Sequence, residues 1–446
     1  MSTLVRAPRA VPKDGRFGHR IGSAFLWENV HRIPNRDSRS SSGRGIPVVD
    51  ALYIHVPFCH AKCLYCDFDS RACRDRAAYE TYAASMIAYL GRLGDVGALA
   101  SCRTAYIGGG TPSVLGERLV ALASAVHMVA PDLTEFTCEA NPESFSGKLA
   151  RSLARAGVTR ISLGVQSFDD AELRALGRLH AADGARAAIA AALDAGLDVS
   201  CDLMCGIPLQ TEASWTATLD AAIATGVGHV SVYPLTIEDG TPLARKVDAG
   251  ELPEPDPDFQ AWCMEEARHR LTAAGMHPYE VASYARPGKE CAHNIAYWTG
   301  RSYLGLGRSA ASMLDRATYD ALRGDLGAPE AADEAARIRF VQTTDALPGG
   351  GDGAPAYELE ELSAREAAAE DLMLGMRMSR GVGEGMLAYA REVIGTDTLD
   401  AAIDEALSRG LAVWREVDGT RRLAPTHDGW LLGNELYGLF WDLADH

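Results

Sequence analysis

The stretch YIHVPFCHAKCLYCDF, residues 53–68, joins a strand-like apolar run to three closely spaced cysteines. Cys59, Cys63 and Cys66 have the spacing C-x3-C-x2-C, which could serve a disulfide framework, a zinc site or an iron–sulfur cluster. Ten cysteines in 446 residues are too few for a disulfide-dense scaffold. In a chain without a recognisable secretory signal, clustered cysteines are more often metal ligands than bridges.

The choice between zinc and a cluster depends on the number of ligands. Structural zinc usually takes four ligands from two separated pairs. The sequence has no second C-x2-C pair, although His60 and Cys73 lie nearby and leave zinc open. A ferredoxin-type cluster needs a fourth cysteine. Three thiolates can instead hold three irons of a 4Fe-4S cluster and leave the fourth iron for a chelating cofactor, which is the interpretation the spacing favours.

Composition narrows the class of protein. The formal net charge of −17 argues against a nucleic-acid partner, because such proteins normally present a basic face. No run of the sequence approaches the roughly 20 apolar residues of a membrane helix. The N-terminus lacks the charged-then-apolar pattern of a signal peptide, so we predict a cytoplasmic protein.

From residue 51 onward, short apolar runs alternate with helix-like segments. This alternation predicts an α/β fold with a parallel sheet and right-handed crossovers, either an incomplete (β/α)6 barrel or an open sheet. The functional loops are then expected at the carboxyl ends of the strands. The predicted strands are 51–56, 104–108, 135–140, 160–165, 198–204 and 229–235, and the clearest helices are 77–93, 169–180 and 182–196.

Polar and glycine residues recur where the predicted strands end. The run YIGGGTPS (106–113) places three glycines after a strand, and glycine lets the backbone approach a ligand closely. Glu139, Gln166 and Asp202 end the following strands, and Arg178 stands at the close of a predicted helix. A single such residue is more often structural, but the whole set after the cysteine loop predicts one ligand site.

Together these motifs resemble the radical S-adenosylmethionine family. Within it the chain is similar to the oxygen-independent coproporphyrinogen III oxidases and their heme-chaperone relatives, over residues 51 to about 310 and more weakly beyond. The resemblance implies a 4Fe-4S cluster on Cys59, Cys63 and Cys66. Its open iron would bind the amino and carboxylate groups of S-adenosylmethionine, and reduction would yield a 5′-deoxyadenosyl radical.

The resemblance also implies which residues meet the cofactor. The glycine-rich turn would face its methionine end, a carboxylate would bind its amino group, and Asp202 would suit the ribose hydroxyls. Tyr65 stands where the family places a ring near the adenine. The full set carried over is Tyr53, Tyr65, Gly109, Gly110, Thr111, Glu139, Gln166, Arg178 and Asp202.

One position separates the two branches of the group. The oxidases carry a further cysteine two residues after the third ligand, whereas this chain has Phe68 there. The difference disfavours porphyrinogen decarboxylation and is typical of the chaperone branch.

A second motif bears on heme. The stretch ECAHNIAYWTGRSYLGLG (290–307) contains His293, Tyr297 and Trp298 in the pattern H-N-x-x-Y-W, which heme-handling relatives use. A neutral imidazole is a good axial ligand, and the aromatic rings could stack on a porphyrin. Cys291 is a competing axial ligand. The residues alone also fit a histidine that hydrogen-bonds locally among packed aromatics.

The domain organisation follows from composition. We predict a basic, poorly ordered extension over 1–49, the radical core over 50–250, and a barrel extension with the heme stretch over 251–324. A flexible linker is expected over 325–356 and a mostly α, winged-helix-like domain over 357–446.

Three functions remain open at this point. The first is a heme chaperone that binds heme and delivers it to respiratory hemoproteins, with a homodimer as one form. The second is an oxygen-independent coproporphyrinogen III oxidase, and the third is a radical methyltransferase that opens the heme ring. Phe68 and the H-N-x-x-Y-W stretch favour the first, and whether the protein is an enzyme is left open.

Overall fold

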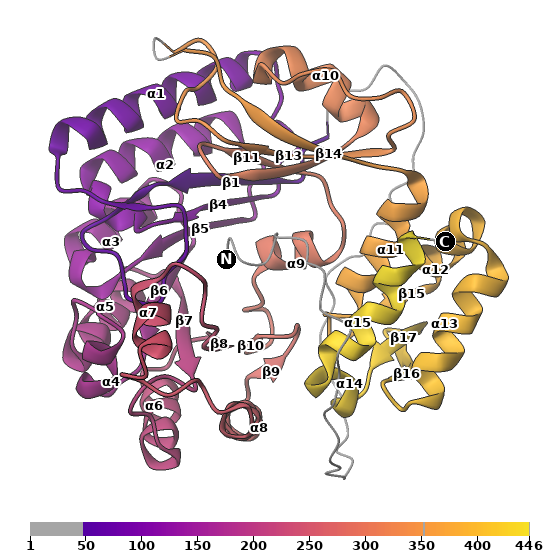
Figure 1. The fold of residues 1–446 in the computed structure, drawn as a ribbon. Coiled ribbons are helices and arrows are strands. Elements are labelled where there is room, and N and C mark those ends of the chain that lie inside the picture. The colour runs from indigo at the N-terminus through magenta and orange to yellow at the C-terminus, as the bar shows by residue number, and fades with distance from the viewer. Residues whose placement is uncertain (1–47, 351–352, 446) are drawn as a thin grey trace.

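The computed structural model describes residues 48–350 and 353–445 and is built around one large curved sheet (Figure 1). The predicted extension over 1–49 falls almost entirely outside these residues. Six parallel strands form the centre of the sheet in the order of the chain, which confirms the predicted parallel α/β fold. They are β1 (Ala51–Val56), β4 (Thr104–Gly109), β5 (Glu135–Ala140), β6 (Arg160–Gln166), β7 (Asp198–Cys205) and β8 (His229–Pro234).

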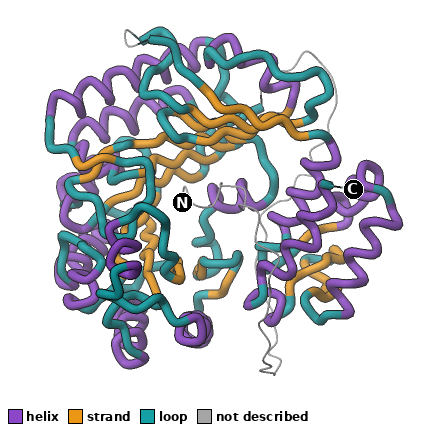
Figure 2. Tube along the Cα trace, viewed as in Figure 1, coloured by secondary structure: helices purple, strands orange, loops and turns teal. Residues whose placement is uncertain are grey.

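Helices cover the outer side of the curve, as Figures 1 and 2 show. Several begin at a side chain that caps the first turn: Asp75 accepts from Ala77 N, and Thr211 forms a reciprocal capping box with Ser214. Their buried faces pack on the sheet, and the large apolar core lies between the two layers. These helices are α1 (Arg76–Asp95), α2 (Glu117–Val129), α3 (Gly147–Arg155), α5 (Ala182–Asp194), α6 (Glu212–Ala224) and α8 (Pro257–Ala273).

The predicted helix over 169–180 is too long. Helix α4 covers only Asp170–Ala175, and Gly177 follows in a left-handed conformation with φ of +74°. A Cβ at Gly177 would lie 2.8 Å from Leu64 Cγ, so the chain turns sharply against the cysteine loop. Arg178 therefore stands in a loop, not at the end of a helix.

Both edges of the sheet are extended by later parts of the chain. β11 (Tyr303–Leu306) pairs in parallel with β1, and β12 (Ala311–Asp315), β13 (Arg337–Gln342) and β14 (Tyr357–Leu362) follow antiparallel. At the other edge β10 (Ser283–Ala285) and β9 (His277–Pro278) continue from β8. The outermost strands, β14 and β9, do not pair with one another, so the barrel is incomplete.

The expected linker over 325–356 is wrong for its middle part. Residues 337–342 form β13, because Ile338 and Phe340 point into the core while the strand pairs on both sides. Helix α10 (Arg316–Leu326) ends where this segment begins. The Gly-, Ala- and Pro-rich composition of 347–356 led to the prediction of one long linker, although β13 lies just before these residues.

The C-terminal part has a small core of its own. A hairpin turns at Asp418 and Gly419, and Trp430 Nε1 donates to Val281 O of the barrel extension at 2.9 Å. Its elements are α11 (Ala364–Gly375), β15 (Val382–Gly383), α12 (Glu384–Ile394), α13 (Thr396–Ser408), β16 (Ala412–Val417), β17 (Thr420–Pro425), α14 (His427–Leu431) and α15 (Gly433–Trp441).

A search of the described ranges for a helix long and apolar enough to cross a membrane finds none.

Candidate cofactor site and heme stretch

The three cysteines lie on a loop that is fixed at both ends. Cys59 ends β2 (Phe58–Cys59), which pairs in parallel with β3 (Arg71–Ala72), and Cys73 N donates to Cys59 O at 2.8 Å. Cys59 is buried, whereas Cys63 and Cys66 are half-buried. Backbone hydrogen bonds therefore hold the two ends of this loop together, and the loop carries the three thiols.

The groups around the thiols fit a negatively charged cluster. Thr111 Oγ1 donates to Cys59 Sγ, and Arg178 Nη1 donates to Cys63 Sγ, each at 3.4 Å. Burial raises the pKa of the Cys66 thiol to about 11, and a backbone hydrogen bond at Phe68 opposes the rise. Iron binding would replace the thiol protons, and hydrogen bonds to the sulfurs stabilise ligated thiolates. The donor set thus suits a cluster held by Cys59, Cys63 and Cys66.

A cluster differs from a single ion because each thiolate takes a separate iron. Among the residues that the structure describes, no three His, Cys, Asp or Glu side chains are grouped as ligands of one metal ion.

The glycine-rich turn packs directly on the cysteine strand. Gly109 has φ of +108°, and a Cβ there would lie 2.6 Å from the His55 ring. A Cβ at Gly110 would lie 2.5 Å from the Phe58 carbonyl oxygen. Gly110 N and Thr111 N donate to Val56 O and Phe58 O at 2.8 and 2.7 Å. Only glycine permits this approach, so the turn and the cysteine loop form one unit.

Two half-buried carboxylates lie on strands β5 and β7. Glu139 accepts from Tyr106 Oη at 2.8 Å and from Gly109 N at 3.0 Å. Asp202 accepts from Ser162 Oγ at 2.8 Å and from Ser200 Oγ at 3.3 Å. Burial raises the pKa of both carboxyl groups, and these donors act against it. Each carboxylate keeps lone pairs for a ligand's amino group or hydroxyl.

Arg178 connects the cluster loop to the strand ends. Its Nη2 donates to Asn141 Oδ1 at 2.7 Å and to Gly164 O at 2.5 Å. Gln166 has φ of +67° at a bulge between β6 and β7, a strained conformation for a side chain other than glycine. Such strain at a strand end is common where a ligand is bound.

Asn141 is a site residue that the sequence reasoning missed. Its Nδ2 donates to Thr111 Oγ1 at 3.0 Å while its Oδ1 accepts from Arg178. The signal was its position directly after β5 in CEANPES, two residues beyond Glu139.

The two predicted tyrosines occupy different surroundings. Tyr53 Oη lies 3.1 Å from His55 Nδ1, and the Tyr53 ring stacks on Tyr106 with centroids 6.2 Å apart. Tyr65 packs against an apolar group that includes Leu176 and Met204, and burial raises its pKa. Tyr65 is thus an apolar wall beside the cysteine loop, which suits an adenine neighbour.

The heme stretch lies at the opposite ends of the strands. It forms α9 (Ala292–Trp298), on the inner side of the curved sheet (Figure 1). His293 is fully buried, and both ring nitrogens are engaged: Nδ1 with Thr104 Oγ1 at 2.9 Å and Nε2 with Tyr297 Oη at 3.0 Å. Burial lowers its pKa to about 3, so the imidazole is neutral at pH 7.

Trp298 and Cys291 are also enclosed. Trp298 packs with Tyr279 and Met378, and the Arg377 guanidinium carbon lies 5.3 Å from the centre of its ring. Cys291 Sγ lies 3.3 Å from Glu135 Oε1. The predicted heme residues therefore lie on one short helix, where His293 and Trp298 are buried and Tyr297 is half-buried.

A buried ion pair that the sequence reasoning missed anchors this helix. Glu135, the first residue of β5, accepts from Ala292 N and His293 N, both at 2.9 Å. Arg160, the first residue of β6, donates to Glu135 at 3.3 Å and to the carbonyls of Lys289 and Glu290. No local pattern announces this pair, since its partners are more than 120 residues away in the chain.

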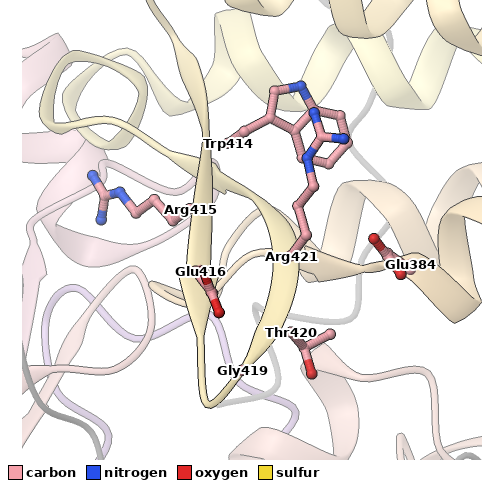
Figure 3. Close-up of a pocket in the computed structure, with 7 residues that line it drawn as sticks. All are labelled: Glu384, Trp414, Arg415, Glu416, Gly419, Thr420 and Arg421. Carbon is pink, nitrogen blue, oxygen red and sulfur yellow. The ribbon is translucent and has the colours of Figure 1, made fainter.

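A surface pocket of about 570 Å³ lies on the C-terminal hairpin (Figure 3). Arg421 covers the Trp414 ring there at 4.1 Å. None of the predicted cofactor or heme residues lines it. The lining residues are Glu384, Trp414, Arg415, Glu416, Gly419, Thr420 and Arg421.

Known proteins that are similar to this chain indicate its family. The model of the radical SAM superfamily matches residues 53–222. The chain is 36% identical to the heme chaperone HemW of Mycobacterium tuberculosis over 357 residues, 76% of this chain and 84% of the relative. It is 30% identical to the heme chaperone HemW of Bacillus subtilis over 400 residues, 87% of this chain and 98% of the relative.

A solved structure shares the fold. Coproporphyrinogen III oxidase (HemN) from Escherichia coli aligns with a TM-score of 0.68 at 19% identity, over 88% of this chain and 90% of that one. At this identity the likeness concerns the fold alone. The sequence identity to the chaperones over nearly their whole length places the chain more closely: it belongs to the radical SAM superfamily and, within its HemN-like group, to the HemW family.

Proposed function

We propose that this protein is a heme chaperone that holds a 4Fe-4S cluster and S-adenosylmethionine, binds heme and passes it to respiratory hemoproteins in the cytoplasm. The observation that carries the proposal is the 36% identity to a protein named heme chaperone HemW over 84% of that protein's length. Phe68, in place of a further cysteine, agrees with it.

The residues present fit the cofactors. Cys59, Cys63 and Cys66 would hold the cluster, with Thr111 and Arg178 donating to two of the sulfurs. The bound cluster and cofactor would supply one-electron chemistry to the site. The list of residues proposed for S-adenosylmethionine is Tyr53, Tyr65, Gly109, Gly110, Thr111, Glu139, Gln166, Arg178 and Asp202.

The protein's own groups would orient that cofactor. Glu139 would accept from its amino group, since Tyr106 and Gly109 each donate to one of its oxygens and so orient the carboxylate. Asp202 would accept from the ribose hydroxyls, and the apolar Tyr65 wall would exclude water from the adenine side.

Heme ligation by His293 needs a rearrangement. The ring is neutral, as an axial ligand must be. Both nitrogens are hydrogen-bonded, however, so iron can reach Nε2 only when Tyr297 releases it and α9 moves from the sheet. We therefore propose that heme binding and displacement of α9 occur together, with Tyr297 and Trp298 available to the porphyrin once exposed.

The test uses full-length protein reconstituted without oxygen. Heme titration should give a saturable Soret shift, and mixing with a heme-free b-type cytochrome should move the heme to the cytochrome. In a parallel incubation with S-adenosylmethionine, dithionite and coproporphyrinogen III, mass spectrometry should find the porphyrin unchanged. Loss of two carboxyl groups from the porphyrin would establish the oxidase and overturn the chaperone proposal.

A further inference from the structure

The cofactor site and the heme stretch meet at one side chain inside the sheet. Tyr106, in the middle of β4, is almost fully buried. Its ring stacks on His293 with centroids 5.1 Å apart and planes 27° apart. Its hydroxyl donates to Glu139 Oε1 at 2.8 Å. Tyr106 therefore contacts the heme-motif histidine with its ring and the cofactor-site carboxylate with its hydroxyl.

On the cofactor side, Tyr106 is one of two groups that hold Glu139. Gly109 N fixes the other oxygen at 3.0 Å, and this N–H belongs to the turn that packs on the cysteine strand. A carboxylate with two oriented donors presents its remaining lone pairs in a fixed direction. Loss of the Tyr106 hydroxyl would leave the half-buried Glu139 carboxylate held by Gly109 N alone and therefore less firmly oriented.

On the heme side, the position of Tyr106 depends on His293. The imidazole covers one part of the Tyr106 ring, and Thr104 from the same strand holds Nδ1. Tyr53 also stacks on Tyr106, at 6.2 Å. Withdrawal of His293 toward an iron would remove the closer of these two stacking contacts and loosen the Tyr106 ring.

We propose that Tyr106 is a positioning residue that couples the two sites, so that heme bound through His293 weakens binding of S-adenosylmethionine at Glu139. This inference rests on the proposed function, because it takes both ligands from it. Coupling between two sites is reciprocal, so S-adenosylmethionine must weaken heme binding by the same factor.

The experiment measures binding by calorimetry without oxygen, on the full-length protein with its cluster. The affinity for S-adenosylmethionine is determined with and without saturating heme. We expect heme to weaken it about fivefold, the lower end of common coupling energies. In Tyr106→Phe, which keeps the ring and loses the hydroxyl, the ratio should fall to within about twofold of one.

Tyr89→Phe is the matched control. Tyr89 is a buried tyrosine on α1 whose hydroxyl has no hydrogen-bond partner among the described residues, so the same chemical change there should leave the ratio at its wild-type value. The ratio, unlike either affinity alone, does not change when a variant is merely less stable.

The outcomes separate the inference from the proposed function. Wild-type protein that binds both ligands with an unchanged or tightened affinity overturns the coupling and leaves the chaperone proposal intact. A wild-type ratio that persists in Tyr106→Phe overturns the role of Tyr106. Wild-type protein that binds no heme overturns the chaperone proposal and the coupling with it.

Discussion

The cysteine loop and α9 are both recognisable motifs for a bound group, but they differ in what the structure leaves available. Two of the three thiols, on Cys63 and Cys66, are half-buried and meet few partners. His293 is fully buried with both ring nitrogens engaged. The cysteine loop thus leaves two thiols partly accessible, whereas both ring nitrogens of the α9 histidine are hydrogen-bonded inside the protein.

The difference follows from where each motif sits on the strands. The cysteine loop lies beyond the carboxyl end of β1, where loops are free to surround a ligand. Helix α9 lies at the amino-terminal ends of β4, β5 and β6. The first residues of these strands, Thr104, Glu135 and Arg160, hydrogen-bond to α9 or to the residues just before it. A substitution in the loop should therefore affect binding, and one in α9 should affect stability.

The largest effect is expected at the loop. Cys63→Ala should lose the iron–sulfur absorbance completely after reconstitution, since a cluster with two protein thiolates is poorly held. The free energy of unfolding of the cluster-free chain should hardly change, because Cys63 is half-buried. Iron and sulfide analysis is the measurement, and Cys73→Ala, another half-buried cysteine, is the control that should keep the cluster. Full iron and sulfide content in Cys63→Ala would refute the ligand assignment.

At α9 the expectation is reversed. His293→Ala should lower the free energy of unfolding by about 3 kcal/mol, because a cavity opens and the buried hydroxyls of Thr104 and Tyr297 lose their partner. Urea unfolding of the cluster-free chain measures the change. Exposed His269, on α8, provides the matched variant, and His269→Ala should stay within about 0.5 kcal/mol of wild type. Equal stability of wild type and His293→Ala would show that the buried His293 does not stabilise the packing of α9 in the fold.

A substitution in the glycine-rich turn tests whether the backbone packing of this turn on the cysteine strand is needed for cofactor binding. Gly110→Ala places a Cβ 2.5 Å from the Phe58 carbonyl oxygen, so the turn must shift away from the cysteine strand. We expect a loss of about 2 kcal/mol in stability and a weaker affinity for S-adenosylmethionine. Gly91→Ala on α1 has open space and should stabilise the chain by about 0.5–1 kcal/mol. Unchanged binding in Gly110→Ala would separate the turn from the cofactor site.

The strands and the cofactor edge were predictable because their signals are local. The apolar run 51–56 has the same bounds as β1, and the polar residues Glu139 and Asp202 lie in the carboxyl-terminal halves of β5 and β7. Parallel strands bring these ends to one edge, so spacing along the chain was enough to predict their proximity.

The buried position of α9 was not predictable, because the residues that contact it lie far from it in the sequence. β11 inserts beside β1, about 250 residues earlier in the chain, and this pairing carries α9 to the inside of the sheet. In the sequence, Glu135 is an ordinary residue at the start of a predicted strand, although it binds Arg160 and the backbone N–H groups of residues 292 and 293 in the structure. Hydrophobic periodicity does not encode such distant polar partners.

A pH titration gives the smallest effect within any one pH unit, and it tests whether the α9 end is held by neutral imidazoles. His229, the first residue of β8, lies 2.7 Å from Ser200 Oγ and 2.9 Å from Tyr279 Oη, and that tyrosine hydroxyl accepts from Cys291 N at the start of α9. Burial, with Arg160 nearby, holds the pKa of His229 well below its usual 6.5.

The sign follows from proton binding. Below pH 6.5 the unfolded chain protonates this histidine and the folded chain does not, so the stability is full above pH 6.5 and falls as the pH decreases, by at most about 1.4 kcal/mol per pH unit. His229→Gln should show a shallower fall between pH 6.5 and 4.5 in urea unfolding. Carboxyls with a raised pKa, such as Glu139, titrate in both proteins and cancel in the difference. Parallel pH profiles of wild type and His229→Gln would mean that His229 is protonated in the folded protein. The start of α9 would then be held by a charged imidazole instead of by neutral hydrogen bonds.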